Sequence, residues 1–208
     1  METRDRIVNA AAHVMRTRGL ARSTTKEIAK AAGFSEATLY KHFRDKTDLF
    51  VAVLREGLPS NLQPLLAGLP DRVGQGSVRA TLEEVARAAI AFYTDTFPIA
   101  ASVFSEPTLL EAHRAALRER RAGPSAITTA LARYLAAERD AGRLAPDLDP
   151  ESAADLLIGA CLNHAFLGKF PGPRDRAEEP AERVAAGFVQ TLLKGAAPRA
   201  GADGADRE

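Results

Sequence analysis

The chain has 208 residues, of which 46% are hydrophobic and 26% are charged, as is ordinary for a globular protein. Its 41 alanines and 23 leucines far outnumber the 16 valines and isoleucines together, which favours an all-α fold over a β-sandwich or barrel. The single cysteine, Cys161, excludes an intrachain disulfide and fits a reducing cytoplasm. We find neither a secretion signal nor an apolar run long enough for a membrane span, so we expect a cytoplasmic protein without a membrane partner.

Charge is distributed unevenly along the chain. Residues 1–56 carry 11 Lys and Arg against 7 Asp and Glu, whereas the remainder carries 17 against 20. Four of the six lysines (Lys26, Lys30, Lys41 and Lys46) lie within 21 positions of one another. This asymmetry favours one anion-facing end on an acidic body, although an ordinary solvated face would give the same pattern.

Four helices are predicted in residues 1–58, which we call the head. Apolar residues at helical spacing predict the first helix over 4–18. A capping-box pattern, Thr24 to Glu27, begins a short second helix that Gly33 closes. Ser35 can cap a third helix that runs to about Phe43, and Asp45 can cap a fourth that ends before Gly57.

The remaining residues divide into a connector, a body and a tail. Residues 59–76 are rich in Pro and Gly and are predicted to be a connector with one helical turn. The body, 77–194, should hold five helices: 77–97, 98–105, 109–141 with a bend at Gly123–Pro124, 150–168 and 178–194. The tail, 195–208, is expected to be disordered.

The most informative segment is 24–43, where two short helices flank a glycine turn. This arrangement is a helix-turn-helix, whose second helix can enter the major groove of DNA. Leu39 and Phe43 share the inward face of that second helix, so its outward face holds Ala37, Thr38 and Lys41. Tyr40 and His42 flank this face, as base readout with phosphate positioning requires.

Residues 3–56 resemble the DNA-binding head of the TetR family of transcriptional regulators. The matching positions are Thr25, Ile28, Ala29, Ala32, Gly33, Ser35, Thr38, Leu39, Tyr40, His42, Phe43, Lys46 and Leu49. Ala37 and Thr47 depart from the family, which often has Gly and Glu there, and Ala37 leaves the target sequence open. The body resembles the family's ligand-binding and dimerisation domain only in length and helix order.

The resemblance implies an all-α fold in which a three-helix head, linked by a fourth helix, joins a larger helical bundle. It implies phosphate contacts from Thr25, Tyr40, His42 and Lys46, and base-edge contacts from Glu36, Ala37, Thr38 and Lys41. The expected partner is double-stranded DNA with a palindromic operator. The full candidate DNA-binding set is Thr24, Thr25, Lys26, Ser35, Glu36, Ala37, Thr38, Tyr40, Lys41, His42 and Lys46.

An enzyme is not expected, because the sequence holds no P-loop, no GxSxG motif and no glycine-rich dinucleotide turn. Histidines form no close metal pair, so we expect neither a metal nor a cofactor. Polar and aromatic residues of the body are candidate ligand contacts, each of which could equally be core. They are Tyr93, Phe97, Phe104, His113, Leu117, Tyr134, Leu157, Cys161 and His164.

Two functions stay open on the sequence. One is a dimeric repressor that a small, mostly apolar ligand releases from its operator; the other is a DNA-bound regulator whose body answers to a protein partner or to no ligand. A cavity of several hundred Å³, lined by the candidates above, would favour the first. Since 59–76 look too loose to transmit force, we expect the fourth and first helices to connect head and body.

The predicted homodimer interface joins the helix 150–168 to the helix 178–194. Both helices are apolar on more faces than one core can cover. The expected contacts are Ala154, Ile158, Leu162 and Phe166 on the first helix, and Val184, Phe188 and Leu192 on the second.

Overall fold

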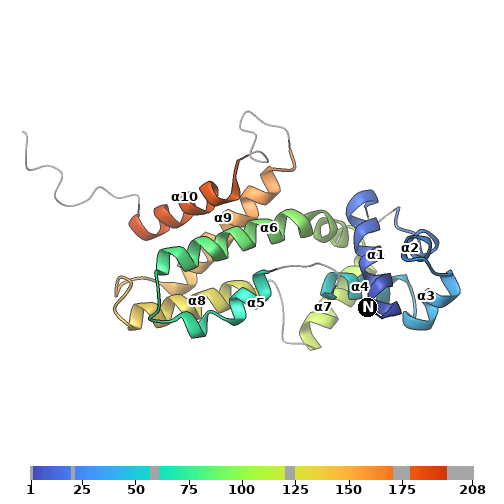
Figure 1. The fold of residues 1–208 in the computed structure, drawn as a ribbon, viewed down its shortest axis with the longest axis horizontal. Helices are drawn as coiled ribbons and strands as arrows, with labels where there is room; N and C mark the ends of the chain where they lie inside the picture. The colour runs from blue at the N-terminus through green and yellow to red at the C-terminus, as the bar shows by residue number, and fades with distance from the viewer. Residues whose placement is uncertain (1, 20–21, 57–60, 120–124, 171–178, 196–208) are drawn as a thin grey trace, which may run out of the picture.

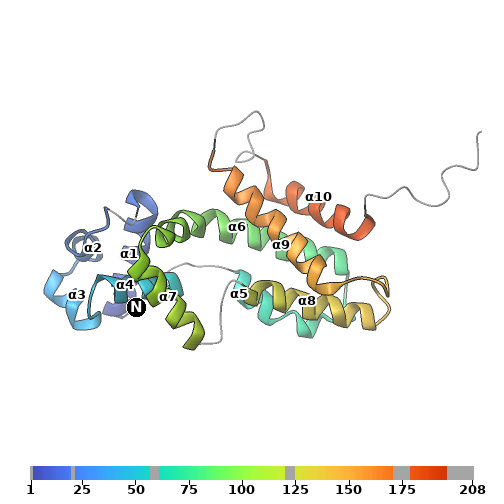
Figure 2. The same cartoon turned by 180° about the vertical axis from the view of Figure 1, so that it is seen from behind.

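The computed structural model describes residues 2–19, 22–56, 61–119, 125–170 and 179–195, which are helical with no strand among them (Figure 1). The elements are α1 (Thr3–Arg18), α2 (Thr25–Ala32), α3 (Glu36–His42), α4 (Lys46–Glu56), α5 (Leu62–Ala67), a 3₁₀ turn (Pro70–Arg72), α6 (Val78–Phe104), α7 (Pro107–Glu119), α8 (Ser125–Asp140), α9 (Pro150–Leu167) and α10 (Ala181–Lys194). The molecule is elongated, with α1–α4 at one end and α5, α8, α9 and α10 at the other (Figures 1 and 2).

The head has its own hydrophobic core. Ile7 and Met15 of α1 pack with Ile28 of α2, Leu39 of α3 and Leu49 of α4, all of them fully buried. The predicted caps are confirmed: the Thr24 hydroxyl accepts from the Glu27 amide at 3.2 Å and that of Ser35 accepts from the Thr38 amide, also at 3.2 Å. These bonds fix where α2 and α3 begin, and so fix the angle at which α3 is presented.

Gly33 makes the turn between α2 and α3 possible. Its φ of +77° lies in the left-handed region, as predicted for the residue that closes α2. Arg6 of α1 donates to the Ala32 carbonyl at 3.1 Å and stacks over the Phe34 ring, 4.6 Å from its centroid. A Cβ on residue 33 would meet this guanidinium at 3.3 Å. The turn therefore needs glycine for its backbone conformation and has little room for a side chain.

The body core lies between α6, α8, α9 and α10. Its fully buried members include Leu82 and Val85 of α6, Leu131 of α8, Ala154 of α9 and Val189 of α10. Asp149 caps α9 as predicted, accepting from the amides of Glu151 and Ser152 at 3.1 and 3.3 Å. The body is thus a helical bundle, as expected from its composition.

The predicted connector is more ordered than the sequence indicates. Residues 62–67 form α5, and Leu62, Leu66 and Leu69 are buried in the body core. The turn after it is also held, because the Gly74 amide donates to the buried carboxylate of Glu138 at 3.3 Å. Arg143 lies 2.9 Å from the same carboxylate and donates to the Gly76 carbonyl at 2.9 Å. The leucines that recur every three or four residues in this segment form the buried face of α5.

Two helix boundaries in the body also differ from the prediction. The expected break before Pro98 is absent, and α6 continues through it to Phe104. The expected single helix over 109–141 is instead two helices, α7 and α8; its predicted bend at Gly123–Pro124 lies outside the described residues. Proline interrupts the helical hydrogen bonding at one residue, but packing on both sides of Pro98 keeps α6 continuous.

The continuity of α6 joins the two halves of the molecule. Its first five turns line the body core, whereas Ile99 and Val103, beyond Pro98, are buried in the head core. Leu109 of α7 is buried in the head core as well, and α7 packs against α4. The expected connection through the first and fourth helices is confirmed, because α1 packs against α6 and α4 packs against α7. The sequence did not predict that residues of α6 and α7 would complete the head core. In the part of the chain that the structure describes, no helix is long and apolar enough to cross a membrane.

Replacement of Leu66 by Ala tests the packing of α5. It should lower the free energy of unfolding by about 3 kcal/mol, because a buried leucine leaves a cavity in the body core. Gln63→Ala, at an exposed position of the same helix, should change it by less than about 0.5 kcal/mol. Equal effects of the two substitutions in urea unfolding would contradict the placement of α5.

Candidate DNA interface and effector groove

The candidate DNA-binding residues surround the starts of α2 and α3 and the start of α4. Most of their side chains are exposed: Thr24, Lys26, Ser35, Ala37, Tyr40, Lys41, His42 and Lys46. Thr25, Glu36 and Thr38 are half-buried. The structure brings this set together at the end of the molecule farthest from the body, where α3 lies on the surface of the head (Figure 1).

Three of these residues are joined in one hydrogen-bonded chain. The Tyr40 hydroxyl donates to Thr25 Oγ1 at 3.3 Å, and Thr25 Oγ1 donates to Glu36 Oε1 at 2.5 Å. The side chain of Glu36 therefore turns toward α2. The sequence placed Glu36 among the residues that face base edges, but its carboxylate is engaged within the head.

Other candidates take part in capping or packing. The Thr38 hydroxyl lies 2.9 Å from the Ser35 hydroxyl, so both belong to the start of α3. Lys46 lies in the first turn of α4, with its ammonium 5.1 Å from the centroid of the Phe50 ring. Two hydrogen bonds from Thr24 hold the pKa of Glu27 below its ordinary value, with Arg18 adding to the effect. Exposed lysines near α3 include Lys26, Lys41 and Lys46, and the His42 side chain is exposed as well.

The fourth helix is tied to the first through Arg4. Its guanidinium donates to the Glu56 carboxylate at 2.5 Å and lies over the Phe43 ring, 5.4 Å from its centroid. This pairing with Glu56 raises the pKa of Arg4 further. A displacement of α4 would therefore also displace α1 and, through the contact with Phe43, the end of α3.

The predicted ligand contacts do not converge on one cavity. Tyr134, Leu157 and Cys161 are buried in the body core, where the Cys161 thiol donates to the Ala86 carbonyl at 3.6 Å and burial raises its pKa to about 12. Burial likewise raises the pKa of Tyr93 and Tyr134 and lowers that of His113. His113 and Leu117 lie half-buried on α7, and Phe104 is 71% exposed at the end of α6.

One further ligand candidate, Phe97, lies near the end of α9, where it meets a predicted dimer contact, Phe166. Phe97 of α6 packs edge-to-face on Phe166, with ring centroids 5.2 Å apart, and Phe166 packs in turn on Phe170. Of the nine predicted residues, only His164 borders the groove between α6 and the end of α9. This groove therefore includes one of the predicted ligand contacts, and Leu157 lines a second groove.

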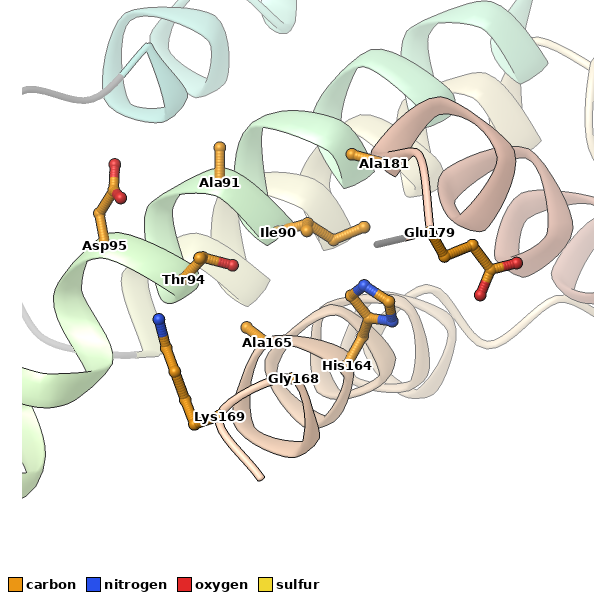
Figure 3. A pocket seen from close by; sticks show the side chains of 10 residues that line it. All are labelled: Ile90, Ala91, Thr94, Asp95, His164, Ala165, Gly168, Lys169, Glu179 and Ala181. Atoms are coloured by element: carbon orange, nitrogen blue, oxygen red, sulfur yellow. The ribbon is translucent and has the colours of Figure 1, made fainter. Parts of the chain in front are cut away.

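That groove, which we call the α6–α9 groove, has a volume of about 420 Å³ and is open to solvent on one side. Its lining residues come from α6, from the end of α9 and from the approach to α10 (Figure 3). They are Ile90, Ala91, Thr94, Asp95, His164, Ala165, Gly168, Lys169, Glu179 and Ala181. The small side chains of alanine and glycine leave this space open. Among its polar residues, Thr94, Asp95, Lys169 and Glu179 are exposed, whereas His164 is buried. Sequence reasoning missed the α6 side, since no motif marks residues that meet α9 only in the folded chain.

The surface of α9 that faces away from the core carries large apolar side chains beside the exposed Asp155 and Asn163. Leu156 is 67% exposed, Leu162 40% and Phe166 37%, and Gly159 between them adds no side chain. We call these four residues the α9 face. A second groove, of about 390 Å³, adjoins it between Leu156 and the α10 residues Phe188 and Leu192. Three of the predicted dimer contacts are wrong, because Ala154, Ile158 and Val184 are buried in the body core of their own chain.

Comparison with known proteins covers both halves of the chain. Residues 7–53 match the family "Bacterial regulatory proteins, tetR family", and residues 72–184 match "Tetracyclin repressor-like, C-terminal domain". Over 53 residues the chain is 43% identical to the transcriptional repressor BepR of Brucella suis, and over 49 residues it is 43% identical to the regulator AcrR of Shigella flexneri. These matches cover about a quarter of this chain (26% and 24%) and of each relative (25% and 23%).

Solved structures match over nearly the whole chain. A TetR-family regulator from Mesorhizobium loti superposes with a TM-score of 0.72 at 24% identity, covering 92% of this chain and 95% of that one. FadR of Bacillus subtilis, solved in complex with stearoyl-CoA, superposes with a TM-score of 0.64 at 16% identity, covering 91% and 97%. At these identities the likeness shows the shared fold. With both family descriptions matched in order, the chain belongs to the TetR family and is a DNA-binding transcriptional regulator.

Proposed function

We propose that this regulator is a homodimeric repressor that binds a palindromic operator and is released from it by a small, mostly apolar ligand. The observation that carries the proposal is the path of α6. Residues 90–95 of this helix line the α6–α9 groove, and residues 99 and 103 of the same helix lie in the head core. A molecule that displaced α6 at the groove would shift the surface on which the head rests.

The DNA contacts divide into two kinds. His42 and Lys46 stand at the end of α3 and the start of α4, away from its outward face, and are proposed to contact phosphates. Ala37 and Lys41 are exposed on α3 itself and are proposed to face base edges in the major groove. The Ala37 methyl group is apolar and can contact only apolar atoms there, such as a thymine methyl.

A second copy of this chain is proposed to cover the α9 face. One α3 helix reads only a few base pairs, so specific binding needs two heads at a fixed separation. Apart from Phe104 at the end of α6, the large exposed apolar side chains of the described body lie on and just beyond α9, and Gly159 allows two such helices to approach closely. Face-to-face packing would hold the bodies together while the heads, at the far end, remain available.

The α6–α9 groove is proposed as the effector site. Ile90, Ala91 and Ala165 supply apolar wall, whereas Lys169 and His164 can meet a polar or anionic group and Asp95 and Glu179 a cationic one. FadR, of similar fold, was solved with stearoyl-CoA, and another regulator of similar fold, AibR, with isovaleryl coenzyme A and operator DNA. Acyl thioesters of coenzyme A, which join an apolar chain to a polyanionic nucleotide, are therefore tested beside small apolar molecules that carry one charged group.

The proposed phosphate contact of Lys46 can be separated from base readout. Lys46→Ala should weaken binding about equally on operator and unrelated DNA, and should reduce the slope of log affinity against log salt by about one unit. Lys41→Ala should instead change the preferred bases, at about 1–3 kcal/mol for the affected position. Anisotropy titrations and selection from random DNA measure both; an unchanged preference in Lys41→Ala would contradict its place in the groove.

The dimer prediction uses a charge placed on the α9 face. Leu156→Glu should give a monomer at micromolar concentration by analytical ultracentrifugation, because two carboxylates would be buried opposite each other. The control, Thr129→Glu, places the same side chain on the exposed face of α8 and should leave the dimer intact. A monomeric wild-type protein would overturn the assignment of this face.

A larger side chain at residue 91 should fill the α6–α9 groove without altering the body core. Ala91 is exposed and lines the groove, so Ala91→Phe should abolish the thermal stabilisation and the DNA release that an acyl-CoA produces in the wild type. Ala80→Phe, at an exposed position near the start of α6, should respond as the wild type does. A compound that still releases DNA from Ala91→Phe would place the effector site elsewhere.

A further inference from the structure

We propose that Glu36 is a positioning residue that competes with DNA phosphates for the hydroxyl proton of Thr25, the group to which Tyr40 donates in turn. This inference rests on the proposed DNA contacts and concerns the same surface of the head. It changes the role that the sequence suggested for Glu36, from reading a base edge to setting how strongly the head binds any DNA.

The hydroxyl groups of Tyr40 and Thr25 have few protons to donate. A hydroxyl group has one proton to donate. The proton of Tyr40 is directed to Thr25 Oγ1 at 3.3 Å, and the proton of Thr25 is directed to Glu36 Oε1 at 2.5 Å. In the free protein both hydroxyls therefore donate within the head. A phosphate oxygen can only accept, so at least one of these two bonds must break before Thr25 or Tyr40 can donate to DNA.

The Glu36 carboxylate resembles a DNA phosphate in charge and in hydrogen bonding. A carboxylate, like a phosphate, is an anion that accepts hydrogen bonds, so it occupies the Thr25 donor with a ligand of the same class. Glu36 also adds a negative charge on the surface that would meet a polyanion, close to the exposed Lys26 and Lys41 that would neutralise phosphates. Both effects oppose DNA binding, and neither depends on base sequence.

The consequence for the dimer follows from linked binding. If each head binds weakly, occupancy of the operator relies on both heads engaging together. A small change in head separation is then enough to release the protein. Glu36 would in this way make DNA binding more sensitive to a displacement of α6.

The test measures affinity for a selected operator and for an unrelated duplex at several salt concentrations. Affinity for both should rise together in the order wild type, Glu36→Gln, Glu36→Ala, reaching about five- to tenfold, since the amide removes the charge and alanine also frees the Thr25 proton. The matched control, Asp147→Asn, removes one carboxylate from the exposed turn between α8 and α9, at the far end of the body, and should stay within about twofold of wild type.

Substituting Thr25 both in the wild type and in Glu36→Ala distinguishes a positioning role of Glu36 from the effect of its charge alone. In the wild-type background, Thr25→Val should lower DNA affinity only slightly, because the Thr25 hydroxyl already donates to Glu36. In the Glu36→Ala background, the same substitution should remove much of the gain in affinity. An equal cost in both backgrounds would overturn the role of Thr25. A change in preferred bases in Glu36→Gln, or weaker binding at unchanged thermal stability, would overturn the inference. A wild-type protein that selects no DNA would instead overturn the proposed contacts themselves.

Discussion

The packing of one helix into two hydrophobic cores connects everything else in this molecule. The first five turns of α6 complete the body core, and its last residues, with Leu109 of α7, complete the head core. Because protein interiors are close-packed, a shift of a buried helix cannot be absorbed locally and moves the side chains packed on it. Pro98 stands between the two parts and removes one backbone hydrogen bond there, so the helix is least braced where it passes from one core to the other.

In the head, the helices are held in fixed positions, and positive and negative side chains lie together on one surface. Side-chain caps, the left-handed Gly33 and the Arg6 guanidinium fix α2 and α3 relative to each other. Exposed lysines would attract a polyanion, whereas the Glu36 carboxylate accepts the Thr25 proton and is proposed to withhold it from a phosphate. Affinity for nucleic acid is thus a balance between opposing charges on one small surface, and a few side chains can set it.

The body combines a tightly packed core with an open groove. Tyr134, Leu157 and Cys161 are packed tightly in its core, while alanine and glycine leave the α6–α9 groove open. The α9 face remains apolar and exposed in a single chain. A surface of this kind is unfavourable in water and is relieved when a second copy covers it. The same end of α9 borders the groove, so dimerisation and ligand binding are proposed to involve neighbouring residues.

The amino-acid sequence by itself determined the local features of this protein. Capping residues, Gly33 and the helical spacing of apolar side chains act over three or four residues, so the helices of the head and the caps of α3 and α9 were predictable. The short range of these interactions also explains why the motif over 24–43 is specific enough to indicate the family.

Only the tertiary structure decided the rest, because it depends on residues far apart in the chain. The leucines of α5 look scattered until α6 and α8 cover them, and α6 crosses Pro98 because it packs on both sides. The family resemblance assigns Glu36 to a base edge, but α2 places Thr25 Oγ1 at 2.5 Å from its carboxylate. Ala154, Ile158 and Val184 could have faced a partner, and packing within the chain buries them instead. Periodicity shows that a helix has an apolar face, whereas which neighbour covers that face is decided by the fold.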